Sequence, residues 1–597
     1  MFDTWIRNNK LESFCWNGTV FEKASNREFW EKVYREEYVK NAEKYLGYSW
    51  PLIRASDYIA FHSEGNRLKQ EVPHFERRKV LAALFIGELM EHRGRFIPDI
   101  VDGIFLICEE SYWGVSAHKP PYYRISSKLP DPFDPYIDLF AGETASLIAT
   151  IYHVLGDELY AFSPEIVKRM ADELDKRIVK PYLSHFDYWW MGYYQKTNNW
   201  NPWILSNIMT VFLFLEMPKA TFYEGLRKML HEINFIYKLF PEDGGCDEGP
   251  TYWKVSGGAL FEFLEQIYLA TNGKVNFFND EKIKNIGTYP YKAYIGNNYF
   301  VISGDGGCHG DVIFKSRLFG YGKRTGNPVL CALANDVAKG RYIVGGMACI
   351  KTSLFNIIYR DEIEAQPPVE LPDEACVDSL ERAFTQNGEW YYAARGGNND
   401  EFHNHNDVGS FVVFYDRSPV IVDPGCGDYT KAHFDPKERY KIWCMRSEWH
   451  NLPRINGICE EWGEIWHCER FKLENKVCRM GLESAYANEA GLEIFDRRIC
   501  FADGVEICDC FRFLNDQNSL EENFTTPLSV EIKENGVILG GCFELYTDTD
   551  SEIILAREEF FGDSAFMKSW ENGFLNRIKF KIVAGKSCDI KFTLRKI

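Results

Sequence analysis

Residues 399–425 of the chain have the sequence "NDEFHNHNDVGSFVVFYDRSPVIVDPG". In its second half, "SFVVFYD" and "PVIVDPG" are short β-branched and aromatic runs joined by "DRSP", a pattern that predicts a β-hairpin. Its first half holds two histidines two residues apart, and Asp423 ends the second run just before a Pro-Gly turn. The stretch therefore joins a strand pattern to side chains that can carry chemistry.

The strand pattern continues from this stretch to the end of the chain. After about residue 375 the apolar period is two, and turn residues bound each run. The clearest other runs are "EWYYAARGG" (389–397), "VEICDCFRFL" (505–514), "CFELYT" (542–547) and "NRIKFKIVAGKSCDIKFTLRKI" (576–597). We therefore predict an antiparallel β domain over residues 371–597.

The sequence before this region has helical periodicity. In "NREFWEKVYREEYVKNAEKYL" (26–46), apolar residues recur on one stripe between Ser25 as N-cap and Gly47 as stop, which predicts one helix. Successive helices with short connections favour hairpins packed in a ring or array. The seam to the β region falls within 358–375, so we predict a helical domain over residues 1–370. Further helices are predicted over 76–92, 97–112, 136–155, 164–178, 203–215, 219–238 and 256–271.

Charge and cysteine content limit the class of partner. The chain has 597 residues, enough for at least two domains, and a formal net charge of −19. This acidity argues against nucleic acid and against a membrane surface, because both favour a basic protein. The 17 cysteines are an odd number spread over a long chain, which favours reduced thiols. Because we see no signal peptide and no membrane span, we expect a cytoplasmic protein, or a periplasmic or secreted one if a leader was removed.

The two histidines of the opening stretch suggest a metal site. On an extended segment, His403 and His405 would point to the same face, about 7 Å apart. Two imidazoles and a carboxylate can bind a divalent metal such as zinc, and Asp423 and His450 are the candidates for further ligands. A simple hairpin would carry Asp423 away from His405, so the metal site requires the chain to fold back near 406–409. A chance pair of structural histidines is the alternative.

Two loops of the helical half are rich in polar residues. "KTNNWNPW" (196–203) places three asparagines around a tryptophan, although turns and helix caps also favour asparagine. "PEDGGCDEGPTYWKV" (241–255) sets acidic residues and Tyr252 around glycines ahead of a helix. A capping turn with a core Tyr-Trp pair is the alternative for the second loop. Neither loop defines a function by itself.

Five motifs in chain order resemble those of the heparinase II/III-like polysaccharide lyases: "NNWN", "DGGCDEGPTYW", "FHNHNDVGSFVVF", "VIVDPG" and "HNLPRING". They span residues 198–457. The resemblance implies a multidomain α and β protein, in which an incomplete (α/α) toroid is followed by an antiparallel β-sandwich. It also implies β-elimination on glycans that contain uronic acid. The substrates it suggests are glycosaminoglycans such as hyaluronan, chondroitin sulfate and heparan sulfate, and next alginate.

The resemblance also assigns catalytic roles. Asn199 is implied to stabilise the substrate carboxylate, with Asn201 as the alternative, because an amide donates hydrogen bonds without adding a proton-transfer group. Tyr252 is implied to protonate the leaving O4 oxygen, and in some relatives one tyrosine serves both proton transfers. His403 is implied either as the base or as the group that neutralises the carboxylate.

Other residues are candidates for binding or orienting the substrate. Glu248 matches an acidic residue of the family that orients the tyrosine or a neighbouring loop. Tyr440 loosely matches a second tyrosine of alginate-cleaving relatives. Arg395 and Arg439 lie near the motifs in sequence and can pair with carboxylate or sulfate groups, with surface placement as the alternative.

The same resemblance implies a metal site formed by His405, Asp423 and His450. Zinc matches this donor set best, and manganese and calcium remain alternatives. We expect the metal to brace the loop that presents His403, with direct Lewis-acid action as the alternative. One departure is that heparin-cleaving relatives carry a histidine near "NNWN", where this chain has none. His185 is the nearest candidate to replace it, and a structural histidine is the alternative.

Two other functions compete with a lyase. A glycoside hydrolase on the same toroid would use two carboxylates, for which Asp243 and Glu248 are the candidates. A carbohydrate-binding protein without activity would keep the metal for its structure. For the lyase, the expected partner is an acidic polysaccharide or oligosaccharide substrate.

Overall fold

The computed structural model describes residues 1–119, 128–342 and 349–597. Contacts within the chain define two compact units, each built from three stretches. The helical unit comprises Met1–Phe240, Lys254–Ile283 and Asp311–Pro367. The β unit comprises Pro241–Trp253, Lys284–Gly310 and Pro368–Ile597. Two segments from the helical half of the sequence therefore belong to the β unit.

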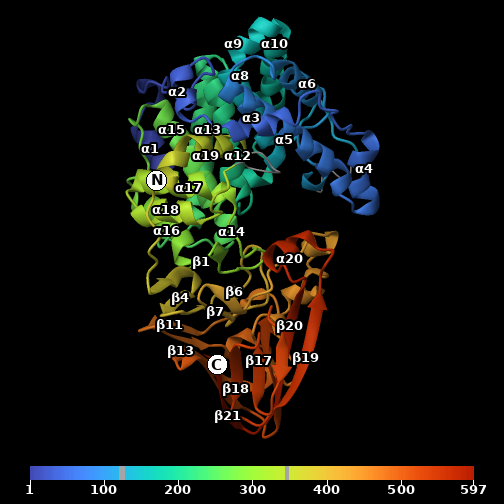
Figure 1. The fold of residues 1–597 in the computed structure, drawn as a ribbon, viewed down its shortest axis with the longest axis vertical. Coiled ribbons are helices and arrows are strands. Elements are labelled where there is room, and N and C mark those ends of the chain that lie inside the picture. The colour runs from blue at the N-terminus through green and yellow to red at the C-terminus, as the bar shows by residue number, and fades with distance from the viewer. Residues whose placement is uncertain (120–127, 343–348) are drawn as a thin grey trace. The chain divides into compact units, whose positions relative to one another are not determined.

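The helical unit consists of helices packed against one another (Figure 1). Helix α12 packs against α8, α13 and α15, and both α8 and α12 are buried along nearly their whole length. A helix buried on all sides is apolar all round, which explains why these segments have weak amphipathic patterns. The helices are α1 (Phe2–Asn8), α2 (Arg27–Lys32), α3 (Glu36–Glu43), α4 (Ala55–Glu64), α5 (Leu68–Glu91), α6 (Ile97–Cys108), α8 (Leu139–Val154), α9 (Gly156–Phe162), α10 (Pro164–Leu174), α11 (Lys180–Ser184), α12 (Trp200–Phe214), α13 (Lys219–Leu239), α15 (Gly257–Ala270), α16 (Glu281–Lys292, which runs on into the β unit), α17 (Val312–Thr325), α18 (Pro328–Asp336) and α19 (Ile350–Glu364).

The predicted single helix over residues 26–46 is wrong. The structure has two helices there, α2 and α3, separated at Arg35, whose backbone is extended (φ −142°, ψ 128°). The N-cap of α2 is Asn26, whose side chain accepts a hydrogen bond from the Phe29 N–H, and not Ser25. After the break, α3 packs along α5, so tertiary packing overrides the helical pattern of the sequence. The other predicted helices each overlap an observed one.

The β unit consists of antiparallel sheets, as the period-two pattern predicts. The three larger sheets have the strand orders β3-β4-β5-β7-β8, β11-β12-β13-β14-β21-β18-β17-β16 and β19-β20-β15-β9. The strands are β1 (Tyr294–Gly296), β2 (Tyr299–Phe300), β3 (Glu374–Val377), β4 (Arg382–Asn387), β5 (Trp390–Arg395), β6 (Asn398–Asn399), β7 (Phe411–Tyr415), β8 (Ser418–Ile421), β9 (Arg454–Ile455), β10 (Gly463–His467), β11 (Arg470–Glu474), β12 (Val477–Gly481), β13 (Leu492–Ala502), β14 (Gly504–Phe513), β15 (Asn518–Thr526), β16 (Val530–Ile532), β17 (Gly536–Leu539), β18 (Phe543–Thr547), β19 (Glu552–Glu559), β20 (Phe574–Ala584) and β21 (Ser587–Lys596), with the short helices α14 (Pro250–Trp253) and α20 (Ser564–Ser569).

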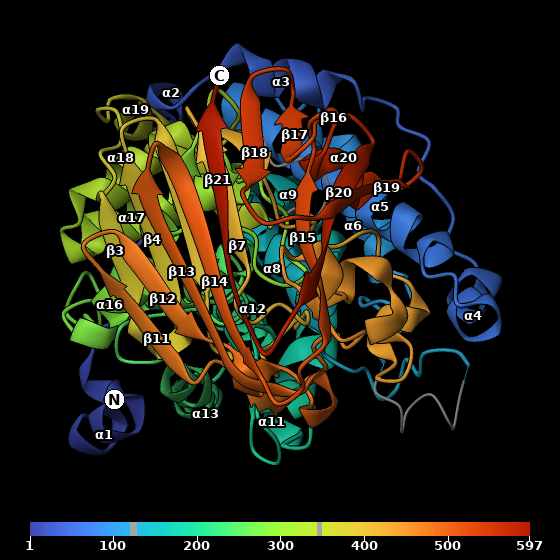
Figure 2. The same ribbon diagram turned by 90° about the horizontal axis from the view of Figure 1, so that it is seen from below.

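The three larger sheets share one apolar core. Figure 2 shows β11 to β14 and β21 side by side in the eight-stranded sheet. Along β14 buried residues alternate with partly exposed ones, so one face of the strand packs into the core. Each fully buried aliphatic or phenyl side chain stabilises the fold by about 1.5–3 kcal/mol. Core members from the three sheets include Val413, Ile421, Phe495, Ile507, Phe524 and Phe580.

Strands β7 and β8 form the predicted hairpin of the opening stretch. Its turn residues Asp416 and Arg417 have φ values of 46° and 59°, the left-handed pair that a type I′ turn requires. Asp423 lies just beyond the end of β8. The side-chain amide of Asn451 donates to one carbonyl in β7 and one just after β8, at 2.7 and 3.0 Å. These bonds tie the hairpin to the segment that carries His450.

Within the described part of the chain, no single helix has the length and hydropathy that crossing a bilayer requires. Helices α8 and α9 reach that length only as a pair, and they are bent by 79° at their junction.

Candidate active site and metal centre

The histidine segment of the β unit is a loop, and not the extended strand expected for it. His403 has a φ of 58°, a left-handed backbone that costs a non-glycine residue on the order of 1–3 kcal/mol and is concentrated at functional sites. The chain then reverses, with the Ser410 N–H donating to the Asp407 carbonyl at 3.1 Å. Gly409 has a φ of 88°, and a Cβ there would lie 2.5 Å from the Leu482 side chain. The predicted fold-back near 406–409 is therefore confirmed.

A second loop brings a carboxylate to this segment. Gly304 has a φ of 51°, and a Cβ at this position would lie 2.1 Å from the carbonyl oxygen of His403. Only glycine permits this approach, after which the Asp305 N–H donates to the same carbonyl at 3.2 Å. The side chain of Asp305 is 2% exposed. The loop thus delivers a buried negative charge next to the two histidines.

The Asp305 carboxylate is surrounded by four side chains. Its Oδ2 lies 3.0 Å from His403 Nδ1 and accepts from the Tyr429 hydroxyl at 2.8 Å. Its Oδ1 lies 3.0 Å from His405 Nε2 and accepts from Arg439 Nη2 at 2.7 Å. Both oxygens therefore have two partners each, which satisfies the acceptor capacity of a buried carboxylate.

A chain of proton-carrying groups leads away from Asp305. The hydroxyl groups of Tyr429 and Tyr252 lie 2.8 Å apart. The Tyr252 ring stacks on the His403 imidazole with 4.1 Å between centroids and 10° between planes. On its other side, His403 Nε2 lies 3.5 Å from an oxygen of Glu248. The structure thus brings together Tyr252 and Glu248 from one motif of the sequence and His403 from another.

Burial and charge set the protonation of these groups. Burial and the nearby Asp305 raise the pKa of Tyr252, and burial and Tyr252 raise the pKa of Tyr429. Burial acts to lower the pKa of His403, but its hydrogen bonds to Asp305 and Glu248 outweigh this and raise it to about 9. Both phenols are therefore protonated and the imidazole is a cation at neutral pH.

Arg439 and Tyr440 flank this chain. Besides its ion pair with Asp305, Arg439 donates from Nε and Nη2 to the carbonyl of Asn404, at 3.2 and 2.9 Å. The Tyr440 hydroxyl accepts from Asn404 Nδ2 at 3.3 Å, and its ring stacks on that of Trp462. Both residues are thus held close to the histidine loop, and their contact with substrate stays a prediction.

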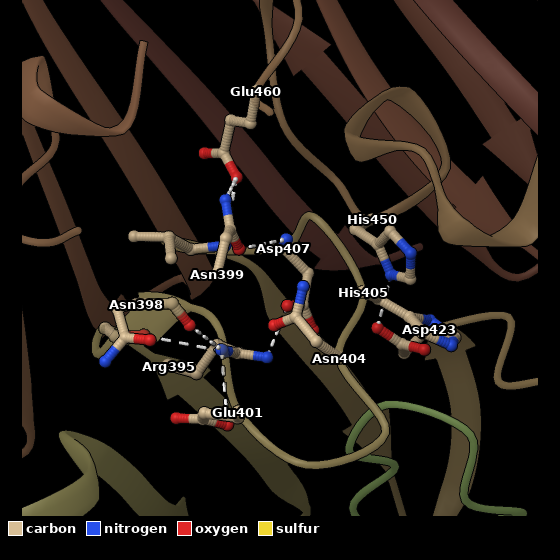
Figure 3. Close-up of polar contacts among 12 residues, drawn as sticks. Arg395, Asn398, Asn399, Glu401, Asn404, His405, Asp407, Asp423, His450 and Glu460 are labelled. Atoms are coloured by element: carbon tan, nitrogen blue, oxygen red, sulfur yellow. Dashed lines mark hydrogen bonds and ion pairs between the residues drawn. The ribbon is translucent and has the colours of Figure 1, made fainter. Parts of the chain in front are cut away.

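His405, Asp423 and His450 form a buried cluster, as predicted. One ligand atom from each residue lies within 4.8 Å of the other two. Figure 3 shows the three side chains turned toward one another, with the hydrogen bond between His450 and Asp423. Two imidazoles and one carboxylate are a common ligand set for zinc, with a further position left for water or substrate.

The hydrogen bonds around the two imidazoles suit metal ligands. His405 Nε2 lies 3.0 Å from Asp305 Oδ1, and His450 Nε2 lies 2.8 Å from the Cys444 carbonyl. Both Nε2 atoms are therefore donors, which leaves Nδ1 of each ring as the atom that faces the cluster. Nδ1 of His405 is buried and has no hydrogen-bond partner among the described residues, and Nδ1 of His450 lies 2.7 Å from Asp423 Oδ2. Acceptors on the far ring nitrogen orient metal-binding histidines in this way.

The His450–Asp423 contact requires a positive charge. A lone pair on Nδ1 would repel the carboxylate oxygen unless a proton or a metal ion lay beside them. With a proton there, Asp423 outweighs the effect of burial and raises the pKa of His450 to about 9. A divalent ion bound by all three residues would supply the positive charge between His450 and Asp423. It would also give Nδ1 of His405 a partner. The donor set therefore fits a metal.

The two predicted asparagines lie in the helical unit. Asn199 is the N-cap residue of α12, and its carbonyl accepts from the Trp203 N–H at 3.2 Å. Asn201 is fully buried, and its amide donates to the carbonyls of Trp190 and Glu232, at 3.1 and 3.3 Å. These bonds account for the amide nitrogen of Asn201, whereas its buried side-chain oxygen has no hydrogen-bond partner among the described residues. The substrate roles of both asparagines stay predictions.

The remaining candidates have structural partners. Arg395 is buried, and Figure 3 shows it linked to Asp407, Glu401 and Asn398, so it is not a surface residue. The Asp243 carboxylate accepts from the Ser379 N–H and hydroxyl and from the Gly245 N–H. His185 contacts Asp134 and Asp187 and stacks on Tyr188.

Asp305 and Tyr429 are residues of the site that the sequence analysis missed. Both lie outside the motifs that carry the family resemblance. The signal for Asp305 was an acidic residue between glycines in "SGDGGCHGD", the same pattern that marked the loop of Tyr252. Tyr429 follows "DPGCGD" with no distinguishing pattern, and only the folded chain brings it to Tyr252.

Comparison with known proteins supports the fold. The sequence matches no protein-family model and no curated protein. Heparinase III shares the fold with a TM-score of 0.64 and 12% identity, over 97% of this chain and 88% of that one. The heparan sulfate lyase HepC of Pedobacter heparinus has a TM-score of 0.57 and 11% identity, over 94% and 83% of the two chains. A chondroitin AC lyase from Streptomyces coelicolor A3 has a TM-score of 0.51 and 11% identity, over 100% and 82%.

These likenesses confirm the predicted fold class. A helical N-terminal region followed by antiparallel β-sheets is the architecture of these polysaccharide lyases. Because the identities are so low, the likeness is one of fold and carries no residue roles. Function must be argued from the site.

Proposed function

We propose that this protein is a polysaccharide lyase that cleaves glycans containing uronic acid by β-elimination, with glycosaminoglycans as the first candidates and alginate as the next. The observation that carries the proposal is the linked set of Tyr252, Tyr429, His403 and Asp305 in the β unit. It contains a phenol that can transfer a proton and a cation beside it, which is the chemistry that β-elimination requires. The lyase fold supports the same conclusion.

The reaction moves one proton and two electron pairs. A base removes the proton from C5 of the uronate, the C5–H electrons form the C4=C5 double bond, and the C4–O4 bond breaks. The leaving O4 oxygen takes up a proton, so no water is consumed. Because C5 lies beside a carboxylate that is already anionic, the site must stabilise additional negative charge in the transition state.

His403 and Tyr252 suit these two demands. With its pKa raised to about 9, the His403 imidazole is a cation that can pair with the uronate carboxylate. The Tyr252 phenol, protonated at neutral pH because burial raises its pKa, can donate its proton to O4. Charge that develops on the phenol oxygen is stabilised by the imidazolium stacked on the ring at 4.1 Å. The hydrogen bonds from Tyr252 through Tyr429 to Asp305 provide a route by which Tyr252 first passes its proton toward Asp305. The resulting phenolate takes the proton from C5 and donates it to O4, and the proton at Asp305 then returns to the phenol, so that one tyrosine serves as base and as acid.

A divalent metal, most simply zinc, is proposed as a resident ion of His405, Asp423 and His450. When bound, it supplies a fixed positive charge that holds the loop between His403 and Asp407 in place. His405 and His403 are two residues apart and share the Asp305 carboxylate. Bracing the loop therefore fixes the ring that stacks on Tyr252.

The test is an ultraviolet assay of the purified protein on hyaluronan, chondroitin sulfates, heparan sulfate and alginate. A lyase generates a C4=C5 double bond that absorbs in the ultraviolet, and we expect this signal with at least one of the polymers. Tyr252→Phe removes only the hydroxyl, so the fold and ring stacking remain while kcat should fall by about 10²–10⁴-fold. New reducing ends without ultraviolet absorbance would show a hydrolase instead. Binding of a polymer without any product would show a carbohydrate-binding protein.

A further inference from the structure

Asp305 is the point at which the metal cluster and the proton-transfer groups meet. Its Oδ1 faces His405, a predicted metal ligand, and its Oδ2 faces His403 and Tyr429. The carboxylate is buried, and it sits on a loop whose glycine, Gly304, touches the His403 carbonyl. One side chain therefore contacts both halves of the site.

We propose that Asp305 is a positioning residue that couples the metal centre to the proton-transfer residues of the proposed lyase. The proposal rests on the proposed function. Through Oδ1 it orients the His405 ring so that Nδ1 faces the metal position. Through Oδ2 it orients the His403 ring over Tyr252 and holds the Tyr429 hydroxyl that contacts Tyr252.

The coupling follows from the rigidity of one small group. A carboxylate cannot turn to suit His405 without also moving its other oxygen away from His403 and Tyr429. A metal ion that holds the His405 ring therefore also restrains Asp305, and through it the His403 ring. Loss of the whole carboxylate is therefore expected to appear both in metal affinity and in the reaction, whereas a change confined to Oδ2 is expected to appear in the reaction alone.

Arg439 fixes the orientation of the Asp305 carboxylate. Its guanidinium donates to Oδ1 at 2.7 Å and to the Asn404 carbonyl at 2.9 Å, so it binds Asp305 and the histidine loop together. An amide placed at position 305 would keep its oxygen on this side, because the guanidinium requires an acceptor. The NH₂ group would then face His403 and Tyr429, where the acceptor Oδ2 had been.

This difference makes two variants informative. In Asp305→Ala both contacts are lost, so we expect zinc affinity to fall about 10–100-fold and kcat to fall about 10²–10⁴-fold. In Asp305→Asn the contact with His405 remains and the contact with His403 is lost. We therefore expect zinc affinity within about threefold of wild type, and a fall in kcat of about 10²–10⁴-fold with little change in KM.

The measurements are zinc affinity, by competition with a chelating dye, and kcat and KM from the ultraviolet assay. Asp57→Asn is the matched control: Asp57 is a buried carboxylate in a helical capping box with Arg54, and its loss tests the effect of removing such a group in general. We expect this control to leave both zinc affinity and kcat unchanged. Circular dichroism and thermal unfolding establish that each variant folds, and Asp305→Asn, which keeps the shape of the side chain, serves if the alanine variant does not.

A triple variant separates positioning from a general loss of structure. If Asp305 acts through His403 and Tyr429, then adding Asp305→Asn to the pair His403→Ala and Tyr429→Phe makes the enzyme no slower than that pair alone. Rate losses that multiply would overturn the proposal. Unchanged zinc affinity in Asp305→Ala, or a wild-type protein that binds no zinc, would also overturn it. Loss of zinc affinity in Asp305→Ala, in a protein that yields no unsaturated product from any polymer, would support the link to the metal and reject the lyase.

Discussion

Two loops of the β unit contain the same tripeptide, Asp-Gly-Gly, at residues 243–245 and 305–307, and their aspartates have different partners. Asp243 accepts hydrogen bonds from Ser379 and from the Gly245 N–H, which holds a turn together. Asp305 accepts from side chains of the candidate active site and the metal cluster. The same motif thus holds a turn in one loop and contacts the candidate active site in the other. The residues that surround each aspartate in the folded chain determine its role.

The glycines of the two loops give the largest expected contrast. Gly304→Ala places a Cβ 2.1 Å from the His403 carbonyl, and Gly244→Ala places one 2.1 Å from the backbone of Asn285. Both positions have positive φ, so each variant should destabilise the protein by about 1–3 kcal/mol, measured as a fall in Tm. Only Gly304→Ala displaces Asp305 from His403, and a displacement of about 1 Å is expected to lower kcat by about 10²-fold. Equal losses of activity in the two variants would show that the distinction between the loops is false.

A smaller effect is expected from Asp243 itself. Asp243→Asn weakens the hydrogen bonds to Ser379, and because Asp243 is partly exposed we expect a loss of stability of about 1 kcal/mol. The ultraviolet assay should give a kcat within about threefold of wild type, since Asp243 is occupied with the turn. A fall of about 10²-fold or more would instead favour the hydrolase, in which Asp243 and Glu248 form a catalytic pair.

The fold was largely predictable because its signals are local. The apolar period changes near residue 375, where the β structure begins. The hairpin of β7 and β8 is predicted by two short apolar runs and the turn between them. The helix predicted over residues 26–46 shows the limit of such signals. Its pattern is regular, yet the chain breaks at Arg35 and α3 packs on α5. The spacing of apolar residues within one segment does not show how that segment packs against a distant one.

The metal cluster could be predicted from the sequence. The contacts of Asp305 and Tyr429 with the catalytic candidates could not. His405 and Asp423 stand in recognisable motifs, and Gly409 supplies the reversal that brings them together. Asp305 reaches His403 across 98 residues of sequence and Tyr429 reaches Tyr252 across 177. No spacing rule links residues so far apart. The Asp-Gly-Gly motif at residue 305 is a local signal, but the same motif at residue 243 holds a turn, so the motif alone does not assign a role.

The most direct test of this account is the kcat of Tyr429→Phe in the ultraviolet assay. Tyr429 lies outside every motif of the family resemblance, and its hydroxyl contacts Tyr252, His403 and Asp305 at 2.8, 3.2 and 2.8 Å. Phenylalanine keeps the ring and removes only this hydroxyl. We predict a fall in kcat of about 10²-fold or more, with a loss of stability of about 1.5–3 kcal/mol because the buried Asp305 carboxylate loses one donor. Unsaturated product formed at the wild-type rate would contradict the account, because the linked hydroxyl groups would then have no part in the reaction.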